Sequence, residues 1–333
     1  MITVEGNAKI NLTLDILGKR PDGYHEVAMV MQSINLHDTL TLSKIPSGIE
    51  LTLDVPGLEA DERNLAWRAA RLLLDGEGVK GGVRIALTKR IPIAAGLAGG
   101  SADAAAVLRG VNALYELGLT EAELCAYGAK LGSDIPFTIV GGTMLATGRG
   151  EVLEALDPVP PFWVVLAKPK ISVSTAWAYK HYDEQGAEQH PDNAAIIQAI
   201  AKRDRAGIAS LLCNVLERVT IKQYPVIAQY KEWMMEKGAL ASMMSGSGPT
   251  VFGLFSAEEE ARRAAAFLEE QTDADLFVCQ TAGANCDTIH KRLKLRTPET
   301  LMRQGFIGFS DIRRHHIMHT VSGTFPINRA VLP

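Results

Sequence analysis

A glycine-rich segment at residues 92–101 constrains the fold of this chain more than any other feature. It follows Val83–Thr88, whose β-branched side chains predict a strand, and it precedes Ala102–Leu114, whose alanines predict a helix. Pro92 lacks a backbone N–H and should end the strand. Glycines permit positive φ angles and close approach of a ligand, while the free N–H groups and the dipole of a helix start attract an anion. The segment therefore predicts a phosphate-binding turn.

Two interpretations of this turn stay open from the segment alone. A flexible connection between strand and helix has the same composition, and Ser101 is as well suited to cap the helix as to bind phosphate. The segment lacks the Gly-Lys-Ser/Thr of a Walker A loop. It also lies too far from the first strand for a dinucleotide-binding GxGxxG turn. The turn by itself indicates anion binding at a helix start and no particular reaction.

The chain before this turn reads mainly as strands. Apolar and polar residues alternate over 8–15, which predicts a half-buried strand with Lys9 and Asn11 on the same face. Further strands are predicted at 27–34, 39–45 and 49–55, and a helix at 64–74. After the turn, Thr120 and Glu123 form the sequence pattern of a capping box, which predicts a helix over 120–131.

A cluster of prolines, Pro158, Pro160 and Pro161, interrupts the pattern and indicates a domain boundary. We predict an N-terminal domain over 1–157 and a C-terminal domain over 158–287. The second half carries helical patterns at 193–202, 208–219, 226–237 and 257–271, and strand patterns at 250–255 and 275–280. This order favours an α+β class, with helices on one side of a mostly antiparallel sheet.

Composition describes an ordinary globular protein, with 47% hydrophobic and 22% charged residues in a chain of 333. No apolar run is long enough to span a membrane, and Glu5 and Lys9 interrupt any signal-peptide core, so we expect a cytoplasmic protein with no membrane partner. The cysteines form neither CxxC pairs nor metal-ligand spacings with His, and we expect reduced thiols and no zinc; they are Cys125, Cys213, Cys279 and Cys286.

The net charge of −4 conceals a basic C-terminal extension. Residues 288–333 contain eight basic and two acidic side chains, so residues 1–287 carry a net charge of −10. This acidic body does not favour nucleic acid. The extension lacks clear periodicity, and its role stays open between nucleic-acid binding and a disordered appendage.

Five separated segments share their motifs with one known family. They are Ala8–Leu12, Arg20–His25, Pro92–Ala106, Gly132–Phe137 and Met244–Thr250. With the pattern Pro-x-x-x-Gly-Leu-x-Gly-Gly-Ser before a helix, they resemble the GHMP kinases (galactokinase, homoserine kinase, mevalonate kinase and relatives). The resemblance implies an N-terminal domain like domain 2 of ribosomal protein S5 and a ferredoxin-like C-terminal domain. It also implies an active site between them that transfers the γ-phosphoryl group of ATP to a small alcohol.

The resemblance makes Asp134 the candidate base and Lys9 its partner. Phosphoryl transfer to an alcohol needs an acceptor for the hydroxyl proton and positive charge beside the transferred group. Lys9 would keep Asp134 ionised and neutralise the developing charge. Taken alone, Asp134 is equally suited to cap the helix that Ile135-Pro136 begins, and a strand lysine is usually a solvated surface residue.

The family pattern also assigns a nucleotide site. ATP is expected at Asn64, Pro92, Ile93, Ala94, Ala95, Gly96, Leu97, Ala98, Gly99, Gly100, Ser101 and Ala102. Mg²⁺ should accompany ATP, yet the sequence contains no carboxylate cluster for a dedicated metal site, so phosphate oxygens and water are expected to supply most ligands.

A second set of residues is assigned to the acceptor, namely Asn11, Tyr24, His25, Tyr179, Gly246, Ser247 and Gly248. The Gly-Tyr-His segment resembles the branch of the family whose acceptor carries cytidine diphosphate, which implies that Tyr24 stacks on the base and His25 bonds its polar edge. A turn tyrosine and a partly exposed histidine are the alternative. Whether the chain is a monomer or a homodimer stays open.

Three departures from the family pattern are Ala98, Ala102 and Val215. The first two should be tolerated because backbone amides do most of the phosphate binding. Two other functions remain to be tested: a GHMP kinase acting on mevalonate or homoserine, neither of which carries a nucleobase, and a non-catalytic sensor that has kept the fold.

Overall fold

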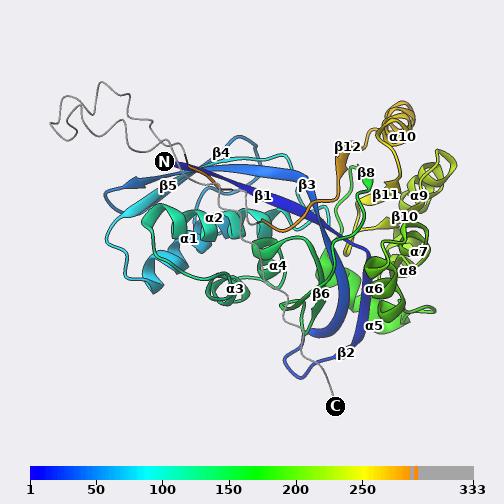
Figure 1. The fold of residues 1–333 in the computed structure, drawn as a ribbon, viewed down its shortest axis with the longest axis horizontal. Helices are drawn as coiled ribbons and strands as arrows, with labels where there is room; N and C mark the ends of the chain where they lie inside the picture. The colour runs from blue at the N-terminus through cyan, green and yellow to red at the C-terminus, as the bar shows by residue number, and fades with distance from the viewer. Residues whose placement is uncertain (286–288, 292–333) are drawn as a thin grey trace, which may run out of the picture. The chain divides into compact units, whose positions relative to one another are not determined.

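The computed structural model describes residues 1–285 and 289–291, and its larger sheet is organised around one long strand, β3 (His25–Ile45) (Figure 1). Four strands pair with β3 in antiparallel orientation: β1 (Ile2–Asn11), β2 (Thr13–Lys19), β5 (Gly82–Thr88) and β6 (Thr143–Thr147). The sequence predicted two strands here, at 27–34 and 39–45, but the chain stays extended between them.

Three further strands complete this side of the sheet. β4 (Ile49–Leu53) pairs in parallel with β5, and β7 (Val152–Ala155) pairs with β6. β13 (Ile289–Lys291) adds to the free edge of β1. The basic extension and Cys286 lie otherwise outside the described residues.

β1 is more deeply buried than its alternation predicted. Its apolar side chains contribute to two hydrophobic clusters, namely Ile2, Val4, Ala8 and Ile10. Its polar side chains are buried as well, since Lys9 is only 4% exposed and Asn11 is fully buried. The expectation of a half-buried strand is therefore wrong, and so is the alternative of a solvated surface lysine at Lys9. Both faces of β1 are covered, and the polar side chains must find partners inside the protein.

Four helices accompany the first sheet: α1 (Leu65–Gly76), α2 (Gly99–Tyr115), α3 (Glu121–Ala129) and α4 (Ile135–Val140). The alanines of α2 bring its backbone close to β1 and β3, on the face of the sheet where Figure 1 also draws α1. The predicted capping box is confirmed, because the Thr120 side chain accepts the N–H of Glu123 while the Glu123 carboxylate accepts that of Thr120.

The second half of the chain forms a four-stranded sheet in the order β10 (Ala241–Met244), β11 (Val251–Phe255), β8 (Trp163–Lys168) and β12 (Asp275–Gln280). Every neighbouring pair is antiparallel, which confirms the predicted antiparallel sheet. The helices of this half are α5 (Thr175–Gln185), α6 (Asn193–Ala201), α7 (Arg205–Ser210), α8 (Glu217–Gln223), α9 (Val226–Glu236) and α10 (Glu258–Gln271).

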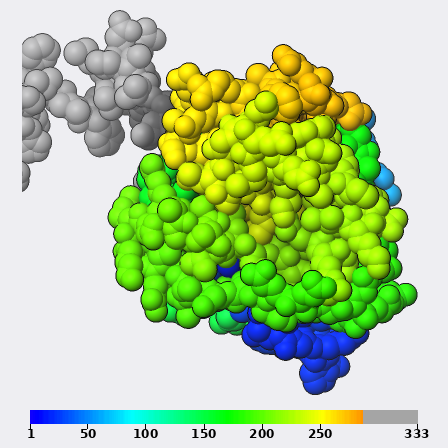
Figure 2. Space-filling view, turned by 90° about the vertical axis from the view of Figure 1, so that its right-hand side faces the viewer, coloured from blue at the N-terminus to red at the C-terminus, as the bar shows by residue number. Residues whose placement is uncertain are grey.

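Figure 2 views the side of the molecule that this second half builds, coloured green to orange, with N-terminal residues in blue at its lower edge.

The single helix predicted over 208–219 is wrong. The chain instead forms α7, a two-residue strand β9 (Cys213–Asn214) and α8. β9 pairs in parallel with β2, so the larger sheet continues into the second half. No helix among the described residues is long and apolar enough to cross a membrane.

Candidate active site

One cavity of about 1030 Å³ collects most of the predicted site residues. Its walls include Lys9 and Asn11 of β1, the phosphate turn, and Asp134 at the start of α4. Tyr24, His25 and Tyr179 line it as well, and so do Gly246 and Ser247 from the turn between β10 and β11. Segments spread over most of the described chain therefore share one space.

The phosphate turn begins its helix earlier than the alanine pattern predicted. α2 starts at Gly99, after Ala98 in a left-handed conformation (φ 58°), and Ala98 offers no capping side chain. The N–H groups of Gly99, Gly100 and Ser101 consequently lie in the first turn, where no intrahelical acceptor is available. Ser101 lies within the helix and does not cap it. This arrangement suits an anion such as a phosphate.

Gly96 is the glycine of this turn that close contact requires. It has a φ of +75°, and a Cβ at this position would lie 2.3 Å from the carbonyl oxygen of Ser245. No residue other than glycine fits there without a backbone shift. Two predicted residues of the turn face elsewhere: Leu97 and Ala102 are buried in a hydrophobic cluster and do not line the cavity.

The amine of Lys9 connects β1 to the phosphate turn. Its Nζ donates to Asn11 Oδ1 (2.6 Å) and to the carbonyl oxygen of Gly96 (3.1 Å). Burial lowers the pKa of Lys9 from its usual value, and attraction by the Asp134 carboxylate opposes that shift. A desolvated ammonium group held beside a carboxylate is suited to stabilise charge that develops on a transferred group.

Asp134 does not serve as a helix cap. It precedes α4, but its side chain makes no capping hydrogen bond, and the carboxylate lines the cavity. The alternative suggested by the sequence is thereby excluded. Within the described chain Asp134 has no ion-pair partner at contact distance, although its charge acts on Lys9. The carboxylate is available to receive a proton from a bound hydroxyl.

The carbonyl of Gly96 joins three parts of the site. It accepts hydrogen bonds from Lys9 Nζ and from Ser245 Oγ (3.0 Å). The second glycine motif is thus placed directly against the phosphate turn. Ser247 Oγ lies 3.0 Å from Thr175 Oγ1, and both Gly246 and Ser247 face the cavity, whereas Gly248 does not line it.

Asn214 explains how this glycine motif is held. Its buried amide donates to the carbonyl oxygens of Met244 (2.9 Å) and Gly246 (2.8 Å). Glu217 accepts the N–H of Met244 at 2.7 Å. Val215, which departs from the family pattern, points into a hydrophobic cluster, so an apolar side chain suits that position. The sequence pattern identified Val215 as a departure, but it did not reveal the anchoring role of Asn214 and Glu217 beside it.

Aromatic side chains line another part of the cavity. Tyr24 is 55% exposed, and the guanidinium of Arg149 lies 5.0 Å from its ring centroid. The rings of His25 and Tyr179 are 4.9 Å apart. Burial raises the pKa of Tyr179 above its usual value, so its phenol remains neutral. These rings offer flat apolar surfaces to a planar group.

Asp183 is a residue of this site that the sequence analysis missed. Its carboxylate contacts His25 Nε2 (2.7 Å) and Lys19 Nζ (2.8 Å), and these hydrogen bonds lower its pKa. It lies on α5, four residues after Tyr179, so both side chains share one helix face. Ile171 and Val173, just before this helix, are β-branched and favour a strand, so the sequence does not reveal this helical spacing.

Asn64 performs a definite structural task. Its side chain caps α1 by accepting the N–H of Ala66 at 2.9 Å and donates to the carbonyl oxygen of Glu59. It also lines the cavity, so the predicted nucleotide contact stays a prediction.

Among the described residues no three His, Cys, Asp or Glu side chains gather as a metal site. Cys125, Cys213 and Cys279 are free thiols.

Family comparisons agree with this geometry. Residues 64–142 match the family described as GHMP kinases N terminal domain, and residues 196–274 match GHMP kinases C terminal. The chain is 51% identical over 264 residues to the 4-diphosphocytidyl-2-C-methyl-D-erythritol kinase of Geobacillus kaustophilus (strain HTA426), covering 79% of this chain and 91% of that relative. It is 50% identical over 282 residues to the enzyme of the same name from Pelotomaculum thermopropionicum, covering 84% and 98%.

Solved structures support the same assignment. A crystal structure of 4-(cytidine 5'-diphospho)-2C-methyl-D-erythritol kinase has a TM-score of 0.73 and 35% identity, covering 84% of this chain and all of that one. The L. major mevalonate kinase in complex with R-mevalonate shares the fold, with a TM-score of 0.68, 17% identity and coverage of 84% and 96%. The fold is the two-domain GHMP kinase fold. The chain therefore belongs to the GHMP kinases, and within them to the family of 4-diphosphocytidyl-2-C-methyl-D-erythritol kinases.

Proposed function

We propose that this chain uses ATP to phosphorylate the 2-hydroxyl of 4-diphosphocytidyl-2-C-methyl-D-erythritol, a step of the non-mevalonate route to isoprenoids. One observation carries the proposal beyond family membership. Lys9 and Asp134 line the same cavity as the phosphate turn and as the aromatic group of Tyr24, His25 and Tyr179. Donor, acceptor and catalytic side chains thus have a common place to meet.

The donor occupies the phosphate turn in this proposal. Backbone N–H groups at the start of α2 bind the phosphates, and the helix dipole adds positive potential. Gly246 and Ser247 add backbone amides from the other side of the cavity. Asn64, at the cap of α1, contributes to the adenosine end. The described residues form no carboxylate cluster, so phosphate oxygens and water would supply most ligands of a Mg²⁺ ion that accompanies ATP, and the ion would neutralise phosphate charge.

Asp134 and Lys9 carry the chemistry. Asp134 accepts the proton of the acceptor hydroxyl while the oxygen of that hydroxyl forms the new bond to the γ-phosphorus. The bond from that phosphorus to the β-γ bridging oxygen breaks, and ADP leaves with the electron pair. Lys9 is placed to neutralise charge on the transferred phosphoryl group, because its Nζ contacts the carbonyl of Gly96 in the phosphate turn, where ATP would bind.

The acceptor is recognised through its cytosine ring. Tyr24 and Tyr179 provide flat surfaces for stacking, and His25 provides a polar edge whose orientation the contact with Asp183 fixes. Lys19 and Arg149 place positive charge at the same end of the cavity, where the diphosphate would lie.

The domain limits and cellular setting are part of the proposal. The change from the first sheet to the second between β7 and β8 supports a division at residues 157 and 158. The acceptor and ATP are charged, water-soluble molecules, which supports a cytoplasmic enzyme acting on small molecules. Oligomeric state, monomer or homodimer, remains a prediction for solution scattering to decide.

A direct test supplies purified chain with ATP, Mg²⁺ and one acceptor at a time, and measures ADP release and product mass. We expect turnover with 4-diphosphocytidyl-2-C-methyl-D-erythritol and none above background with mevalonate or homoserine. Preference for mevalonate or homoserine would replace the proposal by another GHMP activity. ATP binding with no phosphorylated product from any acceptor would indicate a non-catalytic sensor.

A further inference from the structure

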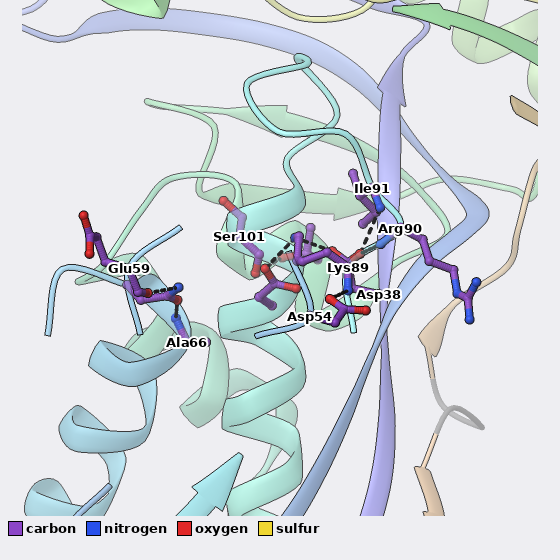
Figure 3. Close-up of polar contacts among 11 residues, drawn as sticks. Asp38, Asp54, Glu59, Ala66, Lys89, Arg90, Ile91 and Ser101 are labelled. Carbon is purple, nitrogen blue, oxygen red and sulfur yellow. Dashed lines mark hydrogen bonds and ion pairs between the residues drawn. The ribbon is translucent and has the colours of Figure 1, made fainter. Parts of the chain in front are cut away.

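A buried network of three charged side chains lies at the base of the phosphate turn (Figure 3). Lys89 Nζ donates to Asp38 Oδ2 (2.5 Å) and to Asp103 Oδ2 (2.7 Å). All three side chains are at least 95% buried. Lys89 and Asp103 belong to the wall of the cavity, so the network is adjacent to the proposed nucleotide site.

The network is attached to both ends of the turn. At its beginning, Asp38 Oδ1 accepts the backbone N–H groups of Arg90 (2.5 Å) and Ile91 (2.9 Å), and Figure 3 draws these bonds. At its end, Asp103 lies in α2, two residues after Ser101. Lys89 connects the two carboxylates across the turn, so the three side chains fix where the turn enters and where it becomes a helix.

The charges of the network conflict with a bound polyphosphate if every group is ionised. Two carboxylates and one ammonium group then leave a net negative charge beside the N–H groups that receive the phosphates. Within the described chain, Asp103 Oδ1 is buried without a hydrogen-bond partner. Since Oδ2 accepts from Lys89, the proton of a neutral Asp103 would lie on Oδ1. An unpaired neutral hydroxyl costs less to bury than an unpaired charged oxygen, and the neutral acid also removes the excess negative charge.

We propose that Asp38, Lys89 and Asp103 position the phosphate turn for ATP, and that Asp103 does so as a neutral carboxylic acid. The proposal rests on the proposed nucleotide site and deepens it. Asp103 is a positioning residue, since it acts through the turn and not on the reacting atoms. Its neutral form leaves Asp38 and Lys89 as a balanced pair, and ATP then meets no excess negative charge.

The surroundings of Asp103 support its neutral form. Burial raises the pKa of Asp103 to about 8, Lys89 opposes the shift, and Asp38 adds to it. These are the charged groups that act on it: Lys89 follows β5 and Asp38 belongs to β3. ATP should therefore bind best below about pH 8 and progressively more weakly above it.

The decisive experiment compares the chain with Asp103→Asn, which keeps the shape of the acid and cannot ionise. The probe is a non-hydrolysable ATP analogue with Mg²⁺, titrated calorimetrically at pH 7, 8 and 9 without acceptor. The ratio of the two dissociation constants cancels the ionisation of the nucleotide itself. We expect the dissociation constant of the parent divided by that of Asp103→Asn to be near one at pH 7. This ratio should rise by up to roughly tenfold by pH 9, since a single proton is linked to binding. A ratio that stays constant with pH would overturn the neutral-acid assignment.

Two further variants separate positioning from general stability. Lys89→Met should weaken binding of the same probe at least about tenfold at pH 7, because the two ends of the turn lose their connection. If this variant does not fold, Asp103→Asn still decides the proposal. Asp204→Ala removes the cap of α7, far along the chain, and should lower the melting temperature while leaving the dissociation constant unchanged. Equal weakening by Asp204→Ala would contradict a positioning role.

These titrations need no acceptor, so they remain informative if the proposed substrate is wrong. Binding of the probe with the expected pH ratio, together with no turnover of the cytidine acceptor, would uphold the network and refute the proposed reaction. Turnover of the cytidine acceptor with a ratio that does not change with pH would support the proposed reaction and refute the neutral-acid assignment of Asp103.

Discussion

Lys9 illustrates how a single residue meets opposing demands of stability and catalysis. Burial removes water from its ammonium group, and Asn11, the Gly96 carbonyl and the field of Asp134 replace only part of that hydration. The lowered pKa of Lys9 means that the folded protein disfavours the charged form relative to the unfolded chain. The position is therefore maintained for function at a cost in stability.

Replacing Lys9 by Met tests this view. The neutral, similarly long side chain should lower kcat at least about a hundredfold, because charge on the transferred group is no longer neutralised. The melting temperature should stay within about 3 °C of the parent, since relief of the desolvation cost offsets the lost hydrogen bonds. Steady-state kinetics and calorimetry measure both. A stable variant with near-normal kcat would remove Lys9 from the mechanism.

Asp134→Asn makes a different prediction at the same scale. Turnover should fall at least about a hundredfold because the amide cannot accept the hydroxyl proton. At saturating ATP, which removes the effect of Asp103 on binding, the kcat of the parent enzyme should decline on the alkaline side below pH 10.5, as Lys9 loses its proton at its lowered pKa. Without the attraction of Asp134 that pKa falls further, so the decline in residual activity should begin at lower pH. An unmoved alkaline limb would show that another group controls it.

At the scale of elements, α5 organises the acceptor end of the site. It presents Tyr179 and Asp183 on one face, against His25. Ser174 begins the helix by accepting the N–H of Trp177. Ile171 and Val173, just before this cap, are β-branched and favour an extended conformation. This local preference for a strand is outweighed by the packing of the helix, whose buried face contains Ala178 and Tyr182.

Asp183→Asn should raise the KM for the cytidine acceptor by about tenfold while leaving ATP affinity unchanged. The amide keeps a hydrogen-bond acceptor for His25 but loses the negative charge that also holds Lys19. The neighbouring exposed residue offers a matched control, Glu184→Gln, which should change neither constant. Initial rates at varied acceptor concentration decide the matter, and equal effects of the two variants would argue against a role for Asp183.

Elements with a strong local signal were predictable from the sequence, and those fixed by distant contacts were not. Thr120 and Glu123 are three residues apart and specify their helix start by themselves. β9 consists of two residues whose extended conformation depends on β2, about 200 positions earlier. The candidate site divides in the same way. Motifs located Lys9, Asp134 and the phosphate turn, whereas Asp103 and Asp183 depend on contacts between separate segments.

At the scale of the whole molecule, β9 and the residues after it connect the two sheets. Asn214 pairs with Leu14 of β2 through the backbone, while its side chain holds the glycine motif of the second half. The larger sheet is therefore coupled to the turn that faces the phosphate segment. Damage to this connection should affect stability and activity together.

Asn214→Ala tests that coupling. The carbonyl oxygens of Met244 and Gly246 would each lose a buried donor, which should lower the free energy of unfolding by about 2–4 kcal/mol. The melting temperature should fall by roughly 5–10 °C, and the KM for ATP should rise because the turn carrying Gly246 is released. Gln223→Ala, at an exposed position of α8, serves as the control and should leave the stability and the KM for ATP unchanged. Chemical denaturation and kinetics give the two readouts, and an unaltered KM would mean that Asn214 only stabilises the fold.

The pairing of β2 with β9 has a consequence for recombination between related genes. The bonds at this junction use main-chain atoms: Cys213 N–H donates to the Leu12 carbonyl and Val215 N–H to the Leu14 carbonyl. The phosphate turn likewise presents a backbone carbonyl, that of Gly96, to Ser245. Main-chain groups are the same in every homologue. A chimera that crosses over between β7 and β8 would keep these main-chain bonds. Its two parents would still have to match in side chains, because Leu12 and Val30 share one hydrophobic cluster with Val164 and Leu166.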